Sequence, residues 1–182
     1  MNARILAMAI GGLLCAGLAA QAQPRTAVAE IRGCTDAAIT GRAQLSEIPS
    51  QEGVKQVLVE LTVRGLPDGK HGVHIHETAN CTPCAAAGGH FDPGPASNPS
   101  PDGNHPFHAG DLINIEVHGG YGVLLTLTSR VTLSPGPLSI FDQDGSAFII
   151  HEKPVTYCPQ GEVHGCAGGG RAACGIIEAV EK

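Results

Sequence analysis

Residues 57–64 read VLVELTVR, with an apolar residue at every second position. A period of two places Val57, Val59, Leu61 and Val63 on one face of a β-strand, while Glu60 and its neighbours take the other face. The segment therefore predicts a strand with one face in a hydrophobic core.

Similar strand patterns recur on both sides of this segment. The predicted strands lie at residues 27–32, 41–46, 57–64, 72–77, 111–117, 123–128, 147–151 and 172–176. Eight short strands separated by turn residues indicate an all-β fold, an eight-stranded antiparallel barrel or sandwich. Two long segments, 78–109 and 152–170, remain as loops, and loops of this length in a compact domain are usually functional.

Length and composition restrict the class of protein. The chain has 182 residues, of which 42% are hydrophobic and 15% charged, so it is neither disordered nor a coiled coil. A net charge of −6 without any basic run argues against a nucleic-acid partner. We expect one domain, over residues 23–182.

The N-terminus has the pattern of a secretory signal peptide over residues 1–22. Arg4 gives a positive start, residues 5–20 are apolar, and Ala20-Gln21-Ala22 is a small-x-small cleavage site. A retained membrane anchor, or a lipoprotein attached through Cys15, is the alternative. We expect a secreted or periplasmic protein with no membrane span after cleavage.

Cysteine usage agrees with export. Six cysteines follow the predicted signal: Cys34, Cys81, Cys84, Cys158, Cys166 and Cys174. An even set in an exported chain implies disulfides, although six cysteines allow 15 pairings. Zinc binding by Cys81 and Cys84 is the alternative, but a single CxxC is weak evidence for it.

Two histidines lie two positions apart in residues 72–77, GVHIHE. On a strand, His74 and His76 point to one face, and Val73 and Ile75 point to the other. Such a pair is half of a metal site, or else a pair of surface histidines.

Further candidate ligands occur where strands meet the long loops. His90 lies in the first loop, His151 ends an apolar strand, and His108 and Asp111 form a His-x-x-Asp. Four imidazoles suit copper, and histidine combined with carboxylate suits zinc.

Taken together, these motifs resemble one known family. The ordered blocks are residues 71–77, 88–93, 108–112, 150–151 and 168–175. From residue 27 onward the chain is similar to copper/zinc superoxide dismutases of the exported bacterial kind. The resemblance implies a Greek-key β-barrel that disproportionates superoxide to oxygen and hydrogen peroxide.

The resemblance also implies residue roles at the copper ion. His74, His76, His90 and His151 would bind copper, and Arg171 would lie beside it and attract superoxide. His90 would in addition take up and deliver a proton, which makes His90 and Arg171 the catalytic residues.

The zinc half departs from the family pattern. His90 would bridge to zinc, with His108 and Asp111 as further ligands. The family carries one more zinc-binding histidine between the positions of His90 and His108, but residues 93–99 contain none. His105 is the substitute, which leaves zinc weakly bound, bound through His105, or absent.

A second departure lies after the last copper ligand. The family has an aspartate four residues after that histidine, which links the two metal sites, and here the position is Val155. Glu162 and His164 in the second loop are candidate stand-ins.

For the disulfides, the resemblance implies that Cys174 pairs with a cysteine of the first long loop. Cys81 has the bacterial spacing and Cys84 has that of cytosolic relatives. We expect Cys81–Cys174, with Cys34–Cys84 and Cys158–Cys166 as the remaining pairs.

Two other functions stay open. The weakened zinc half fits an exported copper-binding or copper-delivery protein on the same fold, or a structural domain without metal. Arg171 argues for the enzyme, because copper storage has no use for it. The sequence leaves the oligomeric state open, a homodimer included.

Overall fold

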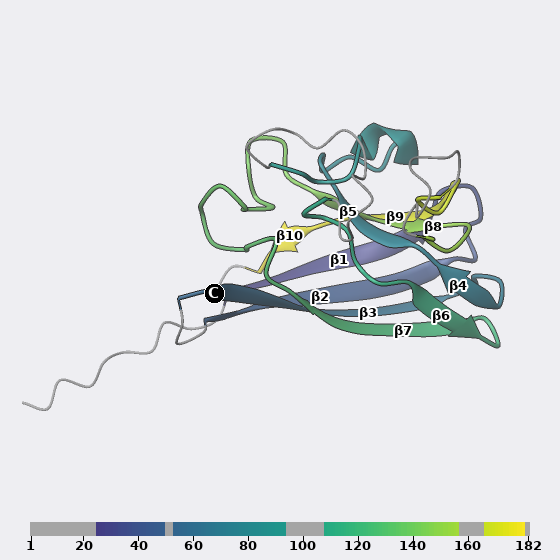
Figure 1. The fold of residues 1–182 in the computed structure, drawn as a ribbon. Helices are drawn as coiled ribbons and strands as arrows, with labels where there is room; N and C mark the ends of the chain where they lie inside the picture. Colours follow the sequence, from purple (N-terminus) through teal and green to yellow (C-terminus); the bar gives the residue numbers. More distant parts are fainter. Residues whose placement is uncertain (1–24, 50–52, 94–107, 157–165, 181–182) are drawn as a thin grey trace, which may run out of the picture.

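The computed structural model describes residues 25–49, 53–93, 108–156 and 166–180 (Figure 1). The predicted signal peptide lies outside these residues. The strands are β1 (Thr26–Gly33), β2 (Thr40–Pro49), β3 (Lys55–Arg64), β4 (Gly69–His71), β5 (Val73–His76), β6 (Ile115–His118), β7 (Tyr121–Thr128), β8 (Ala147–His151), β9 (Arg171–Ile176) and β10 (Glu178–Ala179). A short 3-10 helix, η1 (Cys84–Ala87), lies in the first long loop.

The strands form one antiparallel sheet that nearly closes on itself. Its order is β4-β6-β7-β3-β2-β1-β9-β8-β5, with β10 paired to β1. From β3 the chain crosses to β4 and β5, and then returns through β6 and β7 to the side of β3, which is a Greek-key connection. The two ends of the sheet, β4 and β5, are separated in sequence only by Gly72. The same stretch of chain thus forms both ends of the sheet.

The hydrophobic core lies between two layers of this flattened barrel. In Figure 1, β5, β8 and β9 lie over β1, β2, β3 and β7. Leu45, Leu61 and Leu124 from one layer and Ile75 and Phe148 from the other are at most 2% exposed. Aliphatic side chains provide most of this core because the chain has no tryptophan.

The layer formed by β5, β8 and β9, called the upper layer below, is also covered on its outer face. A second apolar cluster contains Ala87 of η1, Ala147 and Ile149 of β8, and Cys174 of β9. The loop that carries η1 therefore buries the outside of this layer, and polar side chains on that face are buried as well.

The all-β class is confirmed, but the predicted number of eight strands is wrong. Among the described residues the sheet has ten strands. β4 was not predicted, and the strand predicted at residues 72–77 is the shorter β5. Gly72 belongs to neither strand, because its backbone bonds to Lys153 and His151 and not to β6. β10 is a two-residue addition, and residues 111–114 stay outside β6, where Asp111 makes only an isolated bridge to His74.

No helix in the described part of the chain has the length and hydropathy needed to cross a bilayer.

The alternation in β3 predicts opposite effects at adjacent positions. Leu61→Ala should lower the free energy of unfolding by about 2–5 kcal/mol, because it leaves a cavity in the core. Glu60→Ala, on the exposed face of the same strand, should change it by less than about 0.5 kcal/mol. Urea unfolding of the metal-free protein measures both. Equal effects would contradict the register of β3.

Candidate metal centre

Three histidines share the outer face of the upper layer. His74 and His76 lie on β5, and His151 ends the neighbouring strand β8. Val73 and Ile75 of β5 point instead into the core. His74 and His76 are 1% exposed and His151 is 5% exposed, because the long loops cover them. The surface alternative for the His-x-His pair is therefore wrong.

His90 and Asp111 join this group along the free edge of β5. Isolated bridges pair His76 with His90 and His74 with Asp111. Ile75 receives a hydrogen bond on its carbonyl from the Phe91 amide, and its own amide donates to Gly110. A Cβ at Gly110 would lie 2.2 Å from the Ile75 carbonyl oxygen, so glycine is needed for this close approach.

The side chains converge on two points that share His90. The first group is His74, His76, His90 and His151, and the second is His90, His108 and Asp111; within each, the candidate ligand atoms lie within 4.8 Å of one another. The ring centroids of His74 and His90 are 3.8 Å apart, and those of His74 and His151 are 4.8 Å apart. The structure thus brings together all the predicted copper ligands and three of the predicted zinc ligands.

Hydrogen bonds fix which ring nitrogens face the first group. His76 Nδ1 donates to the Gly88 carbonyl (3.0 Å) and His151 Nδ1 donates to the Gly169 carbonyl (3.1 Å). Each ring then keeps its lone pair on Nε2. His76 Nε2, His151 Nε2 and His74 Nδ1 are buried without a hydrogen-bond partner. Three converging buried lone pairs fit a metal ion that prefers imidazole ligands.

Burial keeps these imidazoles neutral. Desolvation lowers the pKa of His76 to about 2 and that of His151 to about 4. It also holds the pKa of His74 well below its ordinary value, and the neighbouring histidines add to the effect. Neutral imidazole is the form that binds metal, so protons do not compete for these nitrogens near neutral pH.

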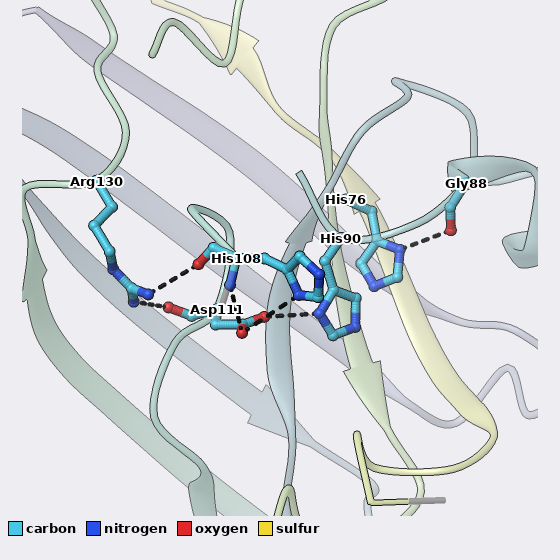
Figure 2. A network of polar contacts seen from close by, with 6 residues as sticks. All are labelled: His76, Gly88, His90, His108, Asp111 and Arg130. Carbon is cyan, nitrogen blue, oxygen red and sulfur yellow. Dashed lines mark hydrogen bonds and ion pairs between the residues drawn. The ribbon is translucent and has the colours of Figure 1, made fainter. Parts of the chain in front are cut away.

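The second group is centred on a carboxylate (Figure 2). His90 Nδ1 donates to Asp111 Oδ1 (2.7 Å), and His108 Nδ1 lies 3.6 Å from Asp111 Oδ2. Burial alone would raise the pKa of Asp111, but hydrogen bonds from His108 and His90 outweigh it and hold the pKa well below its ordinary value. Two imidazoles and one ionised carboxylate suit zinc. The proposed additional ligand, His105, lies outside the described residues.

Arg130 supports the second group and was not predicted from the sequence. Its guanidinium donates to the carbonyls of His108 (2.8 Å) and Asp111, as Figure 2 shows. The segment that carries both ligands is thus fixed through its backbone. Such contacts leave no signal in the sequence, because any residue has a carbonyl.

A second support lies at Val155, the position at which the resemblance led us to expect an aspartate. Asn114 Nδ2 donates to the Val155 carbonyl (3.0 Å), and the Val155 amide donates to Asn114 Oδ1 (2.9 Å). The start of the second long loop is therefore tied to the chain just after Asp111. The candidate stand-ins Glu162 and His164 lie outside the described residues.

Arg171 begins β9 and pairs with His151 in the sheet. Its guanidinium donates to the carbonyls of Cys84 (2.7 Å) and Gly88. Gly88 is also the residue that accepts from His76, so Arg171 lies next to the first group. No carboxylate in the described ranges lies within ion-pair distance of Arg171, in contrast to Arg42, which pairs with Glu30.

Two disulfides link the first loop to the barrel. Cys81 is bonded to Cys174 and Cys34 to Cys84, as expected. The alternative of zinc at Cys81 and Cys84 is therefore wrong. The predicted Cys158–Cys166 pair falls partly outside the described residues.

Comparison with known proteins decides the family. A model described as copper/zinc superoxide dismutase matches residues 39–177. The chain belongs to the copper/zinc superoxide dismutase family. Copper and zinc are the metal ions that this family implies, and the two histidine groups are the residues available for them here.

Relatives occur in bacteria and animals. The Cu-Zn superoxide dismutase of Deinococcus radiodurans is 37% identical over 159 residues, 78% of this chain and 79% of that protein. An extracellular Cu-Zn superoxide dismutase of Caenorhabditis elegans is 37% identical over 126 residues, 66% of this chain and 55% of that protein. The extracellular enzyme of Drosophila melanogaster is 28% identical over 182 residues, 97% of this chain and 98% of that protein.

A solved structure supports the fold. The clock protein EA4 superposes with a TM-score of 0.69 at 28% identity, covering 88% of this chain and 98% of that one.

The buried neutral histidines predict a stability that depends on pH. Unfolding returns each imidazole to a pKa near 6.5, so the unfolded state binds more protons below that pH. The metal-free protein should lose stability as pH falls from 6.5 through 4, by up to about 1.4 kcal/mol per pH unit for each such histidine. His76→Gln should reduce this slope by about one proton between pH 5 and 6. Urea unfolding at several pH values tests it, and equal stability at pH 5 and 7 would contradict neutral burial.

Arg130 predicts a selective effect on zinc. Arg130→Met should weaken zinc binding by about 10–100-fold, because the backbone of His108 and Asp111 loses its support. Copper binding at the first group should change little. Competitive chelator titrations measure both affinities, and Arg64→Met, at an exposed arginine on β3, is the matched control. Unchanged zinc affinity in Arg130→Met would show that its carbonyl contacts do not organise the ligands.

Proposed function

We propose that this protein disproportionates superoxide to oxygen and hydrogen peroxide, with copper bound by His74, His76, His90 and His151. The observation that supports this most strongly is the set of three buried ring nitrogens without partners beside a guanidinium. Copper, when bound, supplies one-electron chemistry, being reduced by one superoxide and reoxidised by the next.

His90 has the position to move a proton. Its Nδ1 is held by Asp111 on the zinc side, so Nε2 is the ring nitrogen left for the copper side. A proton accepted at Nε2 can be delivered to the reduced oxygen product, which needs two protons to become hydrogen peroxide. Asp111 holds the other ring nitrogen of His90 and so keeps Nε2 directed toward the copper side.

Arg171 provides the local charge that attracts the substrate. The chain carries a net charge of −6, which repels an anion at long range. Carbonyls orient the Arg171 guanidinium without neutralising it, so a positive charge remains at the edge of the first group.

We propose zinc at the second group, bound by His90, His108 and Asp111, with His105 as a further ligand. Zinc, if bound there, would help to hold the His90 ring in place, which would link the second group to the first through their shared residue. The weakened ligand set predicts that zinc is the less tightly bound of the two metals.

The proposed activity fits a protein that is exported from the cytoplasm. Two of the relatives are extracellular, and disulfides are typical of oxidising compartments. We propose that residues 1–22 are a signal peptide and that residues 23–182 are the secreted or periplasmic enzyme, either as a monomer or as a homodimer.

A copper carrier on the same fold is the second candidate, favoured by the departures at residues 93–99 and Val155. Metal analysis of the purified mature chain, combined with superoxide consumption followed by pulse radiolysis, separates the two. Bound copper with rapid consumption supports the enzyme. Bound copper without consumption supports the carrier, and a chain that binds no copper excludes both.

Arg171 gives a sharper test of the enzyme. Arg171→Ala should lower the second-order rate constant about tenfold and weaken its dependence on ionic strength, because the steering charge is lost. Copper content should stay the same. Arg64→Ala removes an equal charge from the exposed face of β3, outside both histidine groups, and should leave the rate nearly unchanged. Similar losses in both variants would point to net charge rather than to Arg171.

A further inference from the structure

We propose that Cys34 and Cys84 are positioning residues, and that their disulfide holds the carbonyl groups that orient Arg171. The kinetic consequence rests on the proposed superoxide dismutase activity, whereas the positioning itself does not. The disulfide between Cys81 and Cys174 has a different role, which is to attach the loop to the barrel.

The orientation of Arg171 depends on η1. Arg171 Nη1 donates to the Cys84 carbonyl at the first residue of η1, and Nη2 donates to the Gly88 carbonyl just after its last residue. Two contacts through different nitrogens fix the plane of a guanidinium, and one contact would leave it free to turn. The direction of the charge therefore follows the position of these two carbonyls.

η1 cannot hold that position by itself. It has four residues and no side-chain cap, and Ala87 is its buried residue. A single 3-10 turn has weak internal hydrogen bonds, so its place must come from tertiary links. At Cys84 that link is the bond to Cys34, whose side chain is only partly buried.

Cys34 is in turn fixed next to Arg171. Its backbone amide donates to the Ala172 carbonyl (2.8 Å), and Ala172 directly follows Arg171 on β9. The connections form a closed circuit from Arg171 through Ala172, Cys34 and Cys84 back to the Arg171 guanidinium. Both the base of the arginine and the carbonyl that its tip contacts are thus fixed to the same short piece of backbone.

The other disulfide lies outside this circuit. Cys81 is bonded to Cys174, which is 2% exposed and packs with Ala87 and Ile149 in the apolar cluster. It secures the loop three residues before Cys84.

The test compares the variant Cys34→Ser/Cys84→Ser with the native chain in two backgrounds. With Arg171 present, we expect the second-order rate constant for superoxide to fall about three- to tenfold while copper content stays constant. In the Arg171→Ala background the same double change should cost no further activity. A disulfide with a merely structural role would lower the rate by the same factor in both backgrounds, and that result would overturn the proposal.

A second readout needs neither metal nor turnover. Phenylglyoxal modifies accessible guanidinium groups, and peptide mass spectrometry of the metal-free protein reports each arginine separately. We expect Arg171 to react about two- to tenfold faster in Cys34→Ser/Cys84→Ser, the factor that one lost hydrogen bond represents. Arg64 and Arg130 in the same digest are internal references and should keep their rates. An unchanged rate at Arg171 would overturn the proposal.

The native chain offers the same measurement without any substitution, in case the variant fails to fold. Cys34 and Cys84 line an open surface pocket of about 410 Å³, and Cys81 and Cys174 line the same pocket. A water-soluble phosphine therefore has access to both disulfides, and peptide mapping identifies the molecules that have lost only the Cys34–Cys84 bond. Molecules in which this bond alone is reduced and alkylated should show the faster reaction of Arg171, and an unchanged rate there would again overturn the proposal. If the native protein consumes no superoxide, the proposed activity fails, and the modification rates still decide the positioning role.

Discussion

Strand β5 is buried on both faces, and the rest of the structure depends on how its second face is satisfied. Val73 and Ile75 fill the core in the ordinary way. His74 and His76 carry polar nitrogens into an equally buried place, which is costly unless each nitrogen finds a partner. With His151 they leave three ring nitrogens without one. A metal ion that prefers imidazole ligands would satisfy all three together, which gives the loops that bury this face a reason to enclose it.

Backbone carbonyls are the common means by which this site is oriented. They accept from His76, His151, Arg130 and Arg171, in each case from a ring or guanidinium nitrogen. A carbonyl fixes the direction of a donor without cancelling its charge and without competing for a metal ion. The orientation of the site's side chains therefore depends on the positions of the loops that supply these carbonyls. Links that hold the loops, such as the disulfides and the amide of Asn114, therefore act on the metal groups even though they touch no ligand atom.

The sequence predicted what depends on periodicity and residue type. Alternation identified β3 and the two faces of β5, and the spacing of histidines identified the side chains that meet. Prediction from the sequence failed where backbone hydrogen bonds determine the structure. Gly72 was predicted to begin a strand, but its backbone bonds to His151 and Lys153, so it lies between β4, which was not predicted, and β5. Arg130 contacts only carbonyls, and no pattern marks such an arginine. Cysteine counting alone left 15 pairings, because pairing depends on which loops come together in space.

The distribution of charge over the two groups suits the anionic substrate of the proposed activity, although the protein as a whole is acidic. Asp111 is the carboxylate on the zinc side, and hydrogen bonds from two histidines keep it ionised. The first group is made only of imidazoles and contains no carboxylate, so an ion bound there would keep its full positive charge. Arg171 adds a second positive charge, on which Glu77 acts at a distance without forming an ion pair within the described ranges. Salt screens the long-range effect of the net charge of −6, whereas the positive charge beside the first group acts at short range, where screening is weak.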